Sequence, residues 1–153
     1  MLETPHVMVG AAIAIKFPNP LVAIPLAFAS HFVLEMVPHW NPHLNTETSK
    51  YGHPTKKSTL VVIADSSLAL VGGSLIAYSA LPDTGLAITI LLACLASILP
   101  DLVEAPYFFL KSRNKIIEKW IKFQKSIQND VSIVPGLLTQ YLTIFTAIFW
   151  INS

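Results

Sequence analysis

Residues 21–39 read LVAIPLAFASHFVLEMVPH, an apolar stretch long enough to cross a lipid bilayer that nevertheless carries His31 and Glu35. Asp65 and Asp101 lie in two further apolar runs. A carboxylate at the bilayer centre costs about 2.5–3.5 kcal/mol on insertion scales, so such residues need partners such as a metal ion, a proton or each other. The stretch therefore predicts a membrane helix that contributes to a polar site.

The composition also favours a membrane protein. Hydrophobic residues make up 53% of the 153 residues and charged residues only 12%, whereas about 25% charged is usual for soluble domains. We expect a single integral membrane domain over residues 1–153, without a cleaved leader because the N-terminus lacks a basic flank. The net charge of +1 gives no indication of nucleic-acid binding, and the lone Cys94 excludes an internal disulfide or a cysteine metal cluster.

The apolar runs predict an all-α, multi-pass helical membrane bundle. The run Val7 to Ile15 is too short to cross and is expected to be a re-entrant or hairpin helix. Between Lys111 and Asp130, apolar residues alternate with lysines, which fits an interfacial amphipathic helix and equally a solvated connector. The four expected spans are Leu21 to Val37, Thr59 to Ala80, Leu86 to Leu110 and Val131 to Ile151.

The distribution of basic residues orients these spans. The segments 38–58 and 111–130 are rich in lysine, whereas the turn 81–85 has no basic residue. The positive-inside rule therefore places both basic segments on the cytoplasmic side, in the inner membrane of a cell. With this orientation all the ionisable residues of the apolar runs fall in the cytoplasmic half of the bilayer, which is an independent reason to expect them to converge.

The pattern His31-x3-Glu35-x3-His39 places an imidazole and a carboxylate on one helix face, although Pro38 makes the position of His39 uncertain. Imidazole and carboxylate are the usual ligands of zinc, manganese or iron. Asp65 and Asp101 could add oxygen ligands from other spans. The remaining candidates are the imidazole of His6, from the first element, and Glu104, which lies on a face neighbouring that of Asp101.

Each candidate also has a structural interpretation. For His39, His43 and His53, in a polar loop beside Trp40, hydrogen bonding at the membrane boundary is the favoured interpretation. Asp101 could bond backbone groups freed in a proline-broken helix, and Asp65 could lie near a helix start. The rarity of intramembrane charges makes a joint site the better explanation of the set.

Three motifs resemble the YdjM-like, LexA-regulated inner-membrane proteins, a family of membrane-bound metal-dependent hydrolases distantly grouped with zinc-dependent phospholipase C and P1-type nucleases. The resemblance covers most of the chain. It implies metal ligation by His6, His31, Glu35, Asp65 and Asp101, with His39 as a further candidate. The family usually has Asp where this chain has Glu35, and it tends to carry a histidine after the fourth span, where this chain has none. The motifs are residues 4–12 (TPHVMVGAA), residues 30–40 (SHFVLEMVPHW) and residues 98–101 (ILPD).

These residues and the resemblance lead to the expectation of a metal-dependent hydrolase with zinc, or alternatively manganese, at the cytoplasmic boundary. The metal would lower the pKa of a bound water toward about 7, and Glu35 or Glu104 would act as general base. The depth of the site suits a phosphoester of a lipid or lipid-linked substrate. The phosphate would be held by Lys56, Lys57, Lys111 and Arg113.

Other classes of protein remain open at this point. Asp and His within spans also mark the ion paths of transporters and proton-coupled channels, although no two-half repeat is present. A noncatalytic membrane scaffold with a vestigial metal site is a further alternative. A compact soluble helical domain is disfavoured, because apolar runs of about 20 residues rarely occur there.

Overall fold

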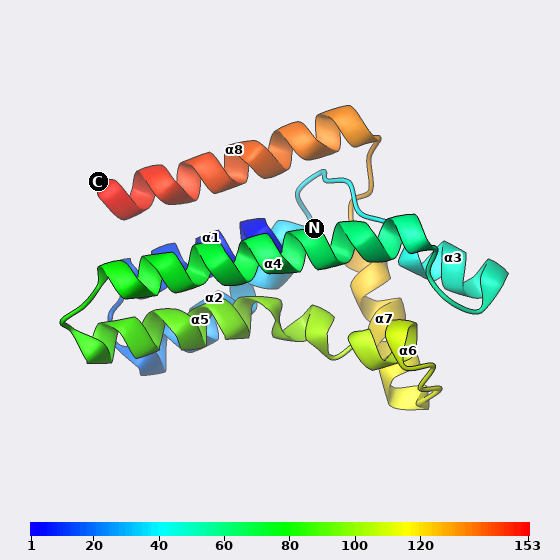
Figure 1. The fold of residues 1–153 in the computed structure, drawn as a ribbon, viewed down its shortest axis with the longest axis horizontal. Coiled ribbons are helices and arrows are strands. Elements are labelled where there is room, and N and C mark those ends of the chain that lie inside the picture. The colour runs from blue at the N-terminus through cyan, green and yellow to red at the C-terminus, as the bar shows by residue number, and fades with distance from the viewer.

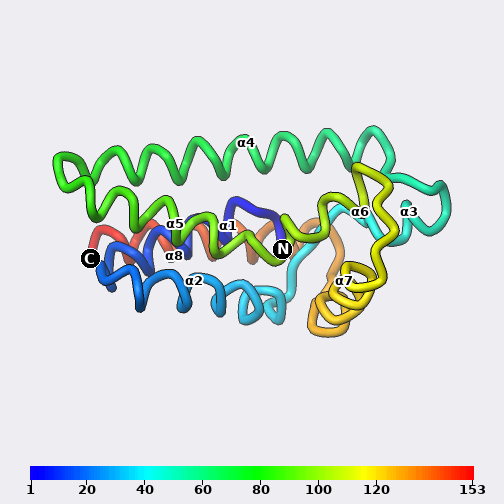
Figure 2. Tube along the Cα trace, turned by 90° about the horizontal axis from the view of Figure 1, so that it is seen from below, coloured from blue at the N-terminus to red at the C-terminus, as the bar shows by residue number.

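The computed structural model describes residues 1–153 and is all-helical. Five long helices run side by side as a bundle, and three shorter ones gather at one end of it (Figures 1 and 2). The bundle consists of α1 (Glu3–Lys16), α2 (Pro20–Glu35), α4 (Lys56–Ser79), α5 (Thr84–Leu102) and α8 (Ile133–Asn152). The other three, here called the cap, are α3 (Leu44–Tyr51), α6 (Ala105–Phe109) and α7 (Lys115–Ile127).

Helix α1 lies at the centre of the bundle and packs on α2, α4, α5 and α8. Its buried residues include Ala11, Ala12 and Ala14, whose small side chains allow neighbouring helices to approach closely. At Gly10 the approach is close, because a Cβ there would lie 2.9 Å from the carbonyl oxygen of Ala93 on α5. The central position of α1 explains how a helix too short to span becomes almost fully buried.

The first two helices form the expected hairpin. A tight connection joins them, in which the Asn19 side chain accepts a hydrogen bond from the Leu21 backbone N–H (3.0 Å) and Pro20 occupies the first turn of α2. The hairpin returns the chain so that the end of α2 meets the start of α1, and His6 thereby lies beside Glu35.

Three helices, α4, α5 and α8, are long and apolar enough to cross a membrane. They present large apolar side chains outward, including Leu70 on α4 and Phe145 on α8, which are 72% and 68% exposed. Such a surface is expected where lipid replaces water as the solvent. The chain therefore has the character of a membrane protein.

A fourth span over Leu21 to Val37 is not confirmed. Helix α2 has 16 residues, a length of about 24 Å at 1.5 Å per residue, against about 30 Å of hydrocarbon. Its last helical residue is Glu35, three residues before Pro38, which has no backbone N–H to continue a helix. The expected run from Leu86 to Leu110 is likewise divided, because α5 ends at Leu102 and the short α6 follows.

The cap is joined to the bundle by backbone pairing as well as by side chains. The His39 N–H donates to the carbonyl oxygen of Asn129, and the Val131 N–H donates to that of His39, both at 3.0 Å. On the other side of the cap, Glu47 of α3 accepts hydrogen bonds from the backbone N–H of Thr55 (2.7 Å) and the hydroxyl of Ser58 (2.8 Å) at the start of α4. These contacts fix the cap over the polar end of the bundle.

Candidate metal centre

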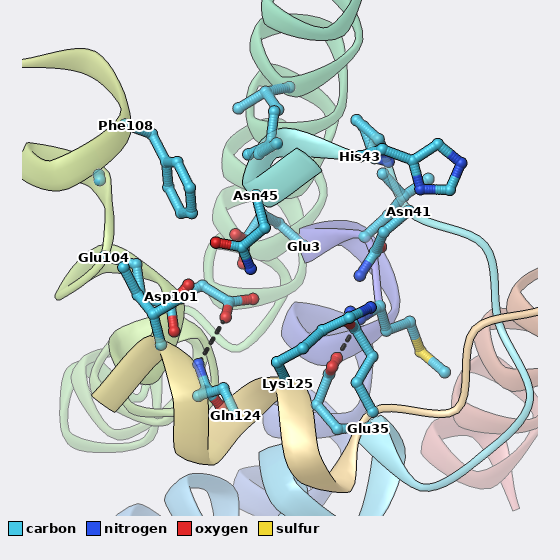
Figure 3. A pocket seen from close by; sticks show the side chains of 18 of the residues that line it. Glu3, Glu35, Asn41, His43, Asn45, Asp101, Glu104, Phe108, Gln124 and Lys125 are labelled. Carbon is cyan, nitrogen blue, oxygen red and sulfur yellow. Dashed lines mark hydrogen bonds and ion pairs between the residues drawn. The ribbon is translucent and has the colours of Figure 1, made fainter. Parts of the chain in front are cut away.

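A cavity of about 210 Å³ lies where the bundle meets the cap. It is unusual in the number of acidic side chains that line it, which come from helices α1, α2, α4 and α5 and from the α5–α6 junction (Figure 3). These side chains are Glu3, Glu35, Asp65, Asp101 and Glu104, and Asp130 from the segment after α7 also lines the cavity. Because like charges repel strongly in a partly buried site, this concentration of carboxylates favours the uptake of positive charge.

His31 is fully buried, and both of its ring nitrogens face oxygen atoms. Nδ1 lies 2.9 Å from the carbonyl oxygen of Ser97, so Nδ1 carries the hydrogen and donates it. In a neutral imidazole Nε2 then has a lone pair. Nε2 lies 3.1 Å from Gln124 Oε1 and 3.6 Å from Asp101 Oδ1.

The orientation of the Gln124 amide follows from its second contact. Its Nε2 donates to Asp101 Oδ1 at 2.9 Å, a contact visible in Figure 3, so its Oε1 is the atom that faces His31. Three electron-rich atoms therefore converge on one point: His31 Nε2, Gln124 Oε1 and Asp101 Oδ1. A cation between them, either a proton or a metal ion, removes the repulsion.

His6 completes this arrangement from the start of α1. Its ring stacks on that of His31 with the centroids 4.3 Å apart. His6 is fully buried, yet its Nδ1 has no hydrogen-bond partner. Ligand atoms of His6, His31 and Asp101 all lie within 4.8 Å of one another. This donor set of two imidazoles and a carboxylate suits a transition-metal ion, and the buried His6 Nδ1, which has no hydrogen-bond partner, is free to bind one.

Glu35 connects two of the histidines. Its Oε1 lies 3.3 Å from His6 Nε2, and its Oε2 lies 3.6 Å from His39 Nε2. The amino group of Met1 also forms an ion pair with Oε1 (Figure 3). Glu35 is thus surrounded by nitrogen atoms, an environment that suits a ligand or a bridging carboxylate better than a free base.

His39 is buried inside the molecule, although the sequence favoured a role at the membrane boundary. Its Nδ1 donates to the carbonyl oxygen of Val37 (2.7 Å), which turns Nε2 toward Glu35. Burial lowers the pKa of His39 and keeps the ring neutral, as metal ligation requires. His43 lines the same cavity (Figure 3) but forms no hydrogen bond or ion pair with these residues, and His53 Nδ1 donates to the carbonyl oxygen of Pro54 (2.8 Å).

Asp65 lines the cavity, but its carboxylate binds the N-terminal end of helix α1. Its carboxylate accepts hydrogen bonds from the backbone N–H of Glu3 (2.5 Å) and from the Thr4 hydroxyl (2.6 Å). The residue before α1, Leu2, has no side chain that could cap the helix. Asp65 therefore supplies the N-terminal cap from α4, which occupies the oxygens that the sequence suggested for a metal.

Glu104 and Glu3 are the least satisfied carboxylates of the cavity. Glu104 Oε1 and Glu3 Oε2 are buried without a hydrogen-bond partner. Burial raises the pKa of Glu104 to about 8, and the nearby Asp101 carboxylate acts in the same direction. Glu104 can therefore hold or release a proton near neutral pH.

The four basic residues expected to bind phosphate lie outside the cavity. Lys56, Lys57 and Lys111 are exposed. Arg113 is engaged elsewhere, because its guanidinium donates to the carbonyl oxygens of Tyr107 and Gly52. The basic residue that lines the cavity is Lys125 of α7 (Figure 3). Lys125 forms an ion pair with Asp130.

Sequence reasoning did not single out Glu3, Ser97, Gln124 or Lys125. One signal was available for Gln124: with Ile117 and Ile121 it lies on the apolar face of the amphipathic pattern, where a polar residue needs a partner. The carbonyl oxygen of Ser97 carries no sequence signal, because any residue supplies one.

Comparisons with protein-family models, with curated proteins and with solved structures find no match to this chain.

Proposed function

We propose that this protein is a membrane-bound metal-dependent hydrolase. The observation that carries the proposal is the convergence of His31 Nε2, Asp101 Oδ1 and Gln124 Oε1, next to the unpartnered imidazole of His6. A hydrogen bond to the carbonyl of Ser97 fixes the His31 ring with Nε2 turned inward. A hydrogen bond from the other ring nitrogen to a backbone carbonyl is typical of histidines that ligate metals.

Zinc is the metal that these donors suit best, with manganese as the alternative. His6, His31 and Asp101 would be the protein ligands, and Glu35 would be the fourth ligand or the bridge to His39. Bound zinc or manganese supplies a Lewis acid and a water molecule of lowered pKa.

Glu104 is the proposed general base. It lines the same cavity as Asp101 and has an unpartnered oxygen directed into a buried environment. A carboxyl group whose pKa lies at about 8 exists in both protonation states near neutral pH, so it can accept a proton from an attacking water and return it to a leaving group. Glu35, which already contacts His6 and His39, is better suited to ligation than to proton transfer.

The proposed substrate is a phosphoester of a lipid or lipid-linked molecule. The cavity lies between the apolar bundle and the cap, and the ten Lys and Arg residues of the chain, except Lys16, belong to the cap or to its junctions with the bundle. In this proposal the cap faces the cytoplasm, by the positive-inside rule. Helix α2 is then a fourth membrane-spanning helix, shorter than the other three, and α1 is a re-entrant hairpin helix. Helix α7 lies at the membrane interface, and Lys125 attracts the phosphate of the substrate.

The test is turnover by purified, reconstituted protein on a panel of lipid phosphomonoesters and phosphodiesters. We expect turnover that a chelator abolishes, that zinc or manganese restores, and that Glu104→Gln lowers by about 100-fold or more, the scale of lost general base catalysis. His53→Ala is the matched control, because His53 lies outside the site. Gradient-driven uptake without turnover would identify a transporter instead. Metal binding without turnover on any of these lipids would favour a scaffold.

A further inference from the structure

Helix α7 presents three different faces, of which only one packs against the rest of the protein along its length. Ile121 and Gln124 are buried and line the cavity. The neighbouring face carries Ile116 and Phe123, which are 76% and 48% exposed. Between these two faces, Trp120 donates from its indole N–H to the carbonyl oxygen of Pro100 at 3.0 Å. An exposed apolar strip thus follows the helix beside the part that closes the cavity.

The apolar strip of α7 continues onto the outer surface of α2. The ring of Phe32 lies 6.0 Å from those of both Trp120 and Phe123. One turn of α2 away, Phe28 stacks edge-on with Phe32 at 5.4 Å and is itself exposed. The two helices therefore share one apolar surface, which in a membrane protein is the surface that contacts hydrocarbon.

The third face of α7 is basic. Lys115, Lys119 and Lys122 follow one another at spacings of four and three residues, so they project from the same side of the helix. All three are exposed, and none of them forms an ion pair, whereas Lys125 is paired with Asp130. The helix carries a single acidic residue, Glu118. The three lysines therefore outnumber the one acidic residue of the helix, and no ion pair within the chain neutralises them.

Helix α7 lies across the end of the bundle, whereas α4, α5 and α8 run along it (Figures 1 and 2). If these three cross the bilayer, α7 lies parallel to the membrane surface at the level where headgroups meet hydrocarbon. An apolar strip beside a row of lysines is the arrangement of helices that bind anionic membrane surfaces.

We infer that the basic face of α7, formed by Lys115, Lys119 and Lys122, is a docking surface for the headgroups of anionic phospholipids. This inference rests on the membrane placement in the proposed function but not on metal binding or turnover. Lipid bound to this face also acts on the cavity, through helix α7. Because an α-helix is rigid over four turns, lipid that holds the lysines also holds Gln124 against His31 and Asp101.

The experiment uses Trp120 as the reporter. In the full chain with Trp40→Phe and Trp150→Phe, Trp120 is the remaining tryptophan. The protein is placed in nanodiscs of equal parts phosphatidylglycerol and phosphatidylcholine, with bromine on the acyl chains of one lipid or of the other. Bromine quenches indole fluorescence at short range, so the two preparations report which lipid lies beside α7.

We expect brominated phosphatidylglycerol to quench Trp120 at least twice as strongly as brominated phosphatidylcholine, and we expect the preference to disappear in the triple variant K115Q, K119Q and K122Q. The control K50Q, K56Q and K57Q removes the same charge from α3 and α4 and should keep the preference. Because all six lysines are exposed, these variants should fold.

Three results would overturn the inference: equal quenching by the two lipids, a preference that survives in the α7 variant, or its equal loss in the control. Equal quenching would leave the basic face to another occupant, such as an acidic protein. Absence of quenching by either lipid would overturn the membrane placement of α7 itself. None of these readouts depends on metal or on hydrolysis, so failure of the enzymatic proposal is distinguishable from failure of this one.

Discussion

His31 Nε2 lies 3.6 Å from Asp101 Oδ1, at the contact between the ends of helices α2 and α5. The same helix α5 also supplies the carbonyl oxygen of Ser97, which accepts the Nδ1 hydrogen of His31. Ser97 and Asp101 are separated by one helical turn, so α5 fixes the tautomer of the imidazole and provides the charge opposite its free nitrogen. The contact between His31 and Asp101 is therefore a candidate cation site.

Gln124→Ala is expected to lower metal affinity by about 10- to 100-fold, the range found for residues that orient metal ligands. The substitution removes the contacts to both His31 and Asp101. Isothermal titration with zinc measures the effect. Ser126→Ala, at an exposed position of the same helix, is the control. Equal affinity in the two variants would show that Gln124 does not position the ligands.

Asp65→Ala is expected to destabilise the fold by about 1–2 kcal/mol, as the loss of a helix N-cap does, and to leave metal affinity nearly unchanged. The reason is that the Asp65 carboxylate is occupied by the backbone N–H of Glu3 and the Thr4 hydroxyl. Denaturant unfolding in detergent measures the first effect and zinc titration the second, with the exposed Ser67→Ala as control. A variant of normal stability that has lost its metal would make Asp65 a ligand.

Glu104 should make the stability of the metal-free protein depend on pH. Its pKa is about 8 in the folded chain, above the ordinary 4.5. The stabilisation of the protonated form is fully present below pH 4.5 and is lost as the pH rises through about 8, because the unfolded chain ionises first. The glutamine of the Glu104→Gln variant does not ionise, so the variant should not lose this stabilisation as the pH rises.

The measurement for Glu104 is the melting temperature of protein and variant in chelator at pH 5 and pH 8.5. The unsubstituted protein should lose more stability between the two pH values than Glu104→Gln does. An identical change in both proteins would mean that Glu104 ionises normally in the folded chain.

Gly136→Ala is expected to destabilise the protein by about 1–3 kcal/mol, the usual cost of overpacking. A Cβ at this position of α8 would overlap the backbone nitrogen of Trp40 and would lie 2.8 Å from the carbonyl carbon of His39. Gly85→Ala is the control, since its Cβ would meet only the Asp83 carboxylate at 3.4 Å. Thermal unfolding measures both, and equal stability would mean that the His39–Trp40 loop yields without cost.

Much of the bundle follows from the sequence because apolar length and proline position are local properties. The hairpin of the first two helices, the helical character of the chain and three helices of membrane-spanning length were all predicted. The fourth expected span was placed by its apolar composition, but α2 ends at Glu35, before Pro38. Composition reports the environment of a stretch, whereas proline decides where its helix ends.

The meeting of His6, His31, Glu35 and Asp101 was also expected from their common depth. The partners of these residues were not, because contacts between distant segments leave little trace in a single sequence. Asp65 illustrates the difference: its depth was compatible with a metal ligand, yet it caps α1, a helix whose own preceding residue offers no cap. Gln124 reaches the same site from 23 residues beyond Asp101, through the fold of the cap.

Metal content tests the central claim most directly. The protein is purified without added metal, and zinc and manganese are measured by inductively coupled plasma mass spectrometry in the unsubstituted chain, in His31→Ala and in the control His53→Ala. We predict at least one equivalent of metal in the unsubstituted chain and in His53→Ala, and a loss of most of it in His31→Ala. A folded, metal-free protein that also takes up neither ion on titration would contradict the claim, and a proton would then be the cation between His31 and Asp101.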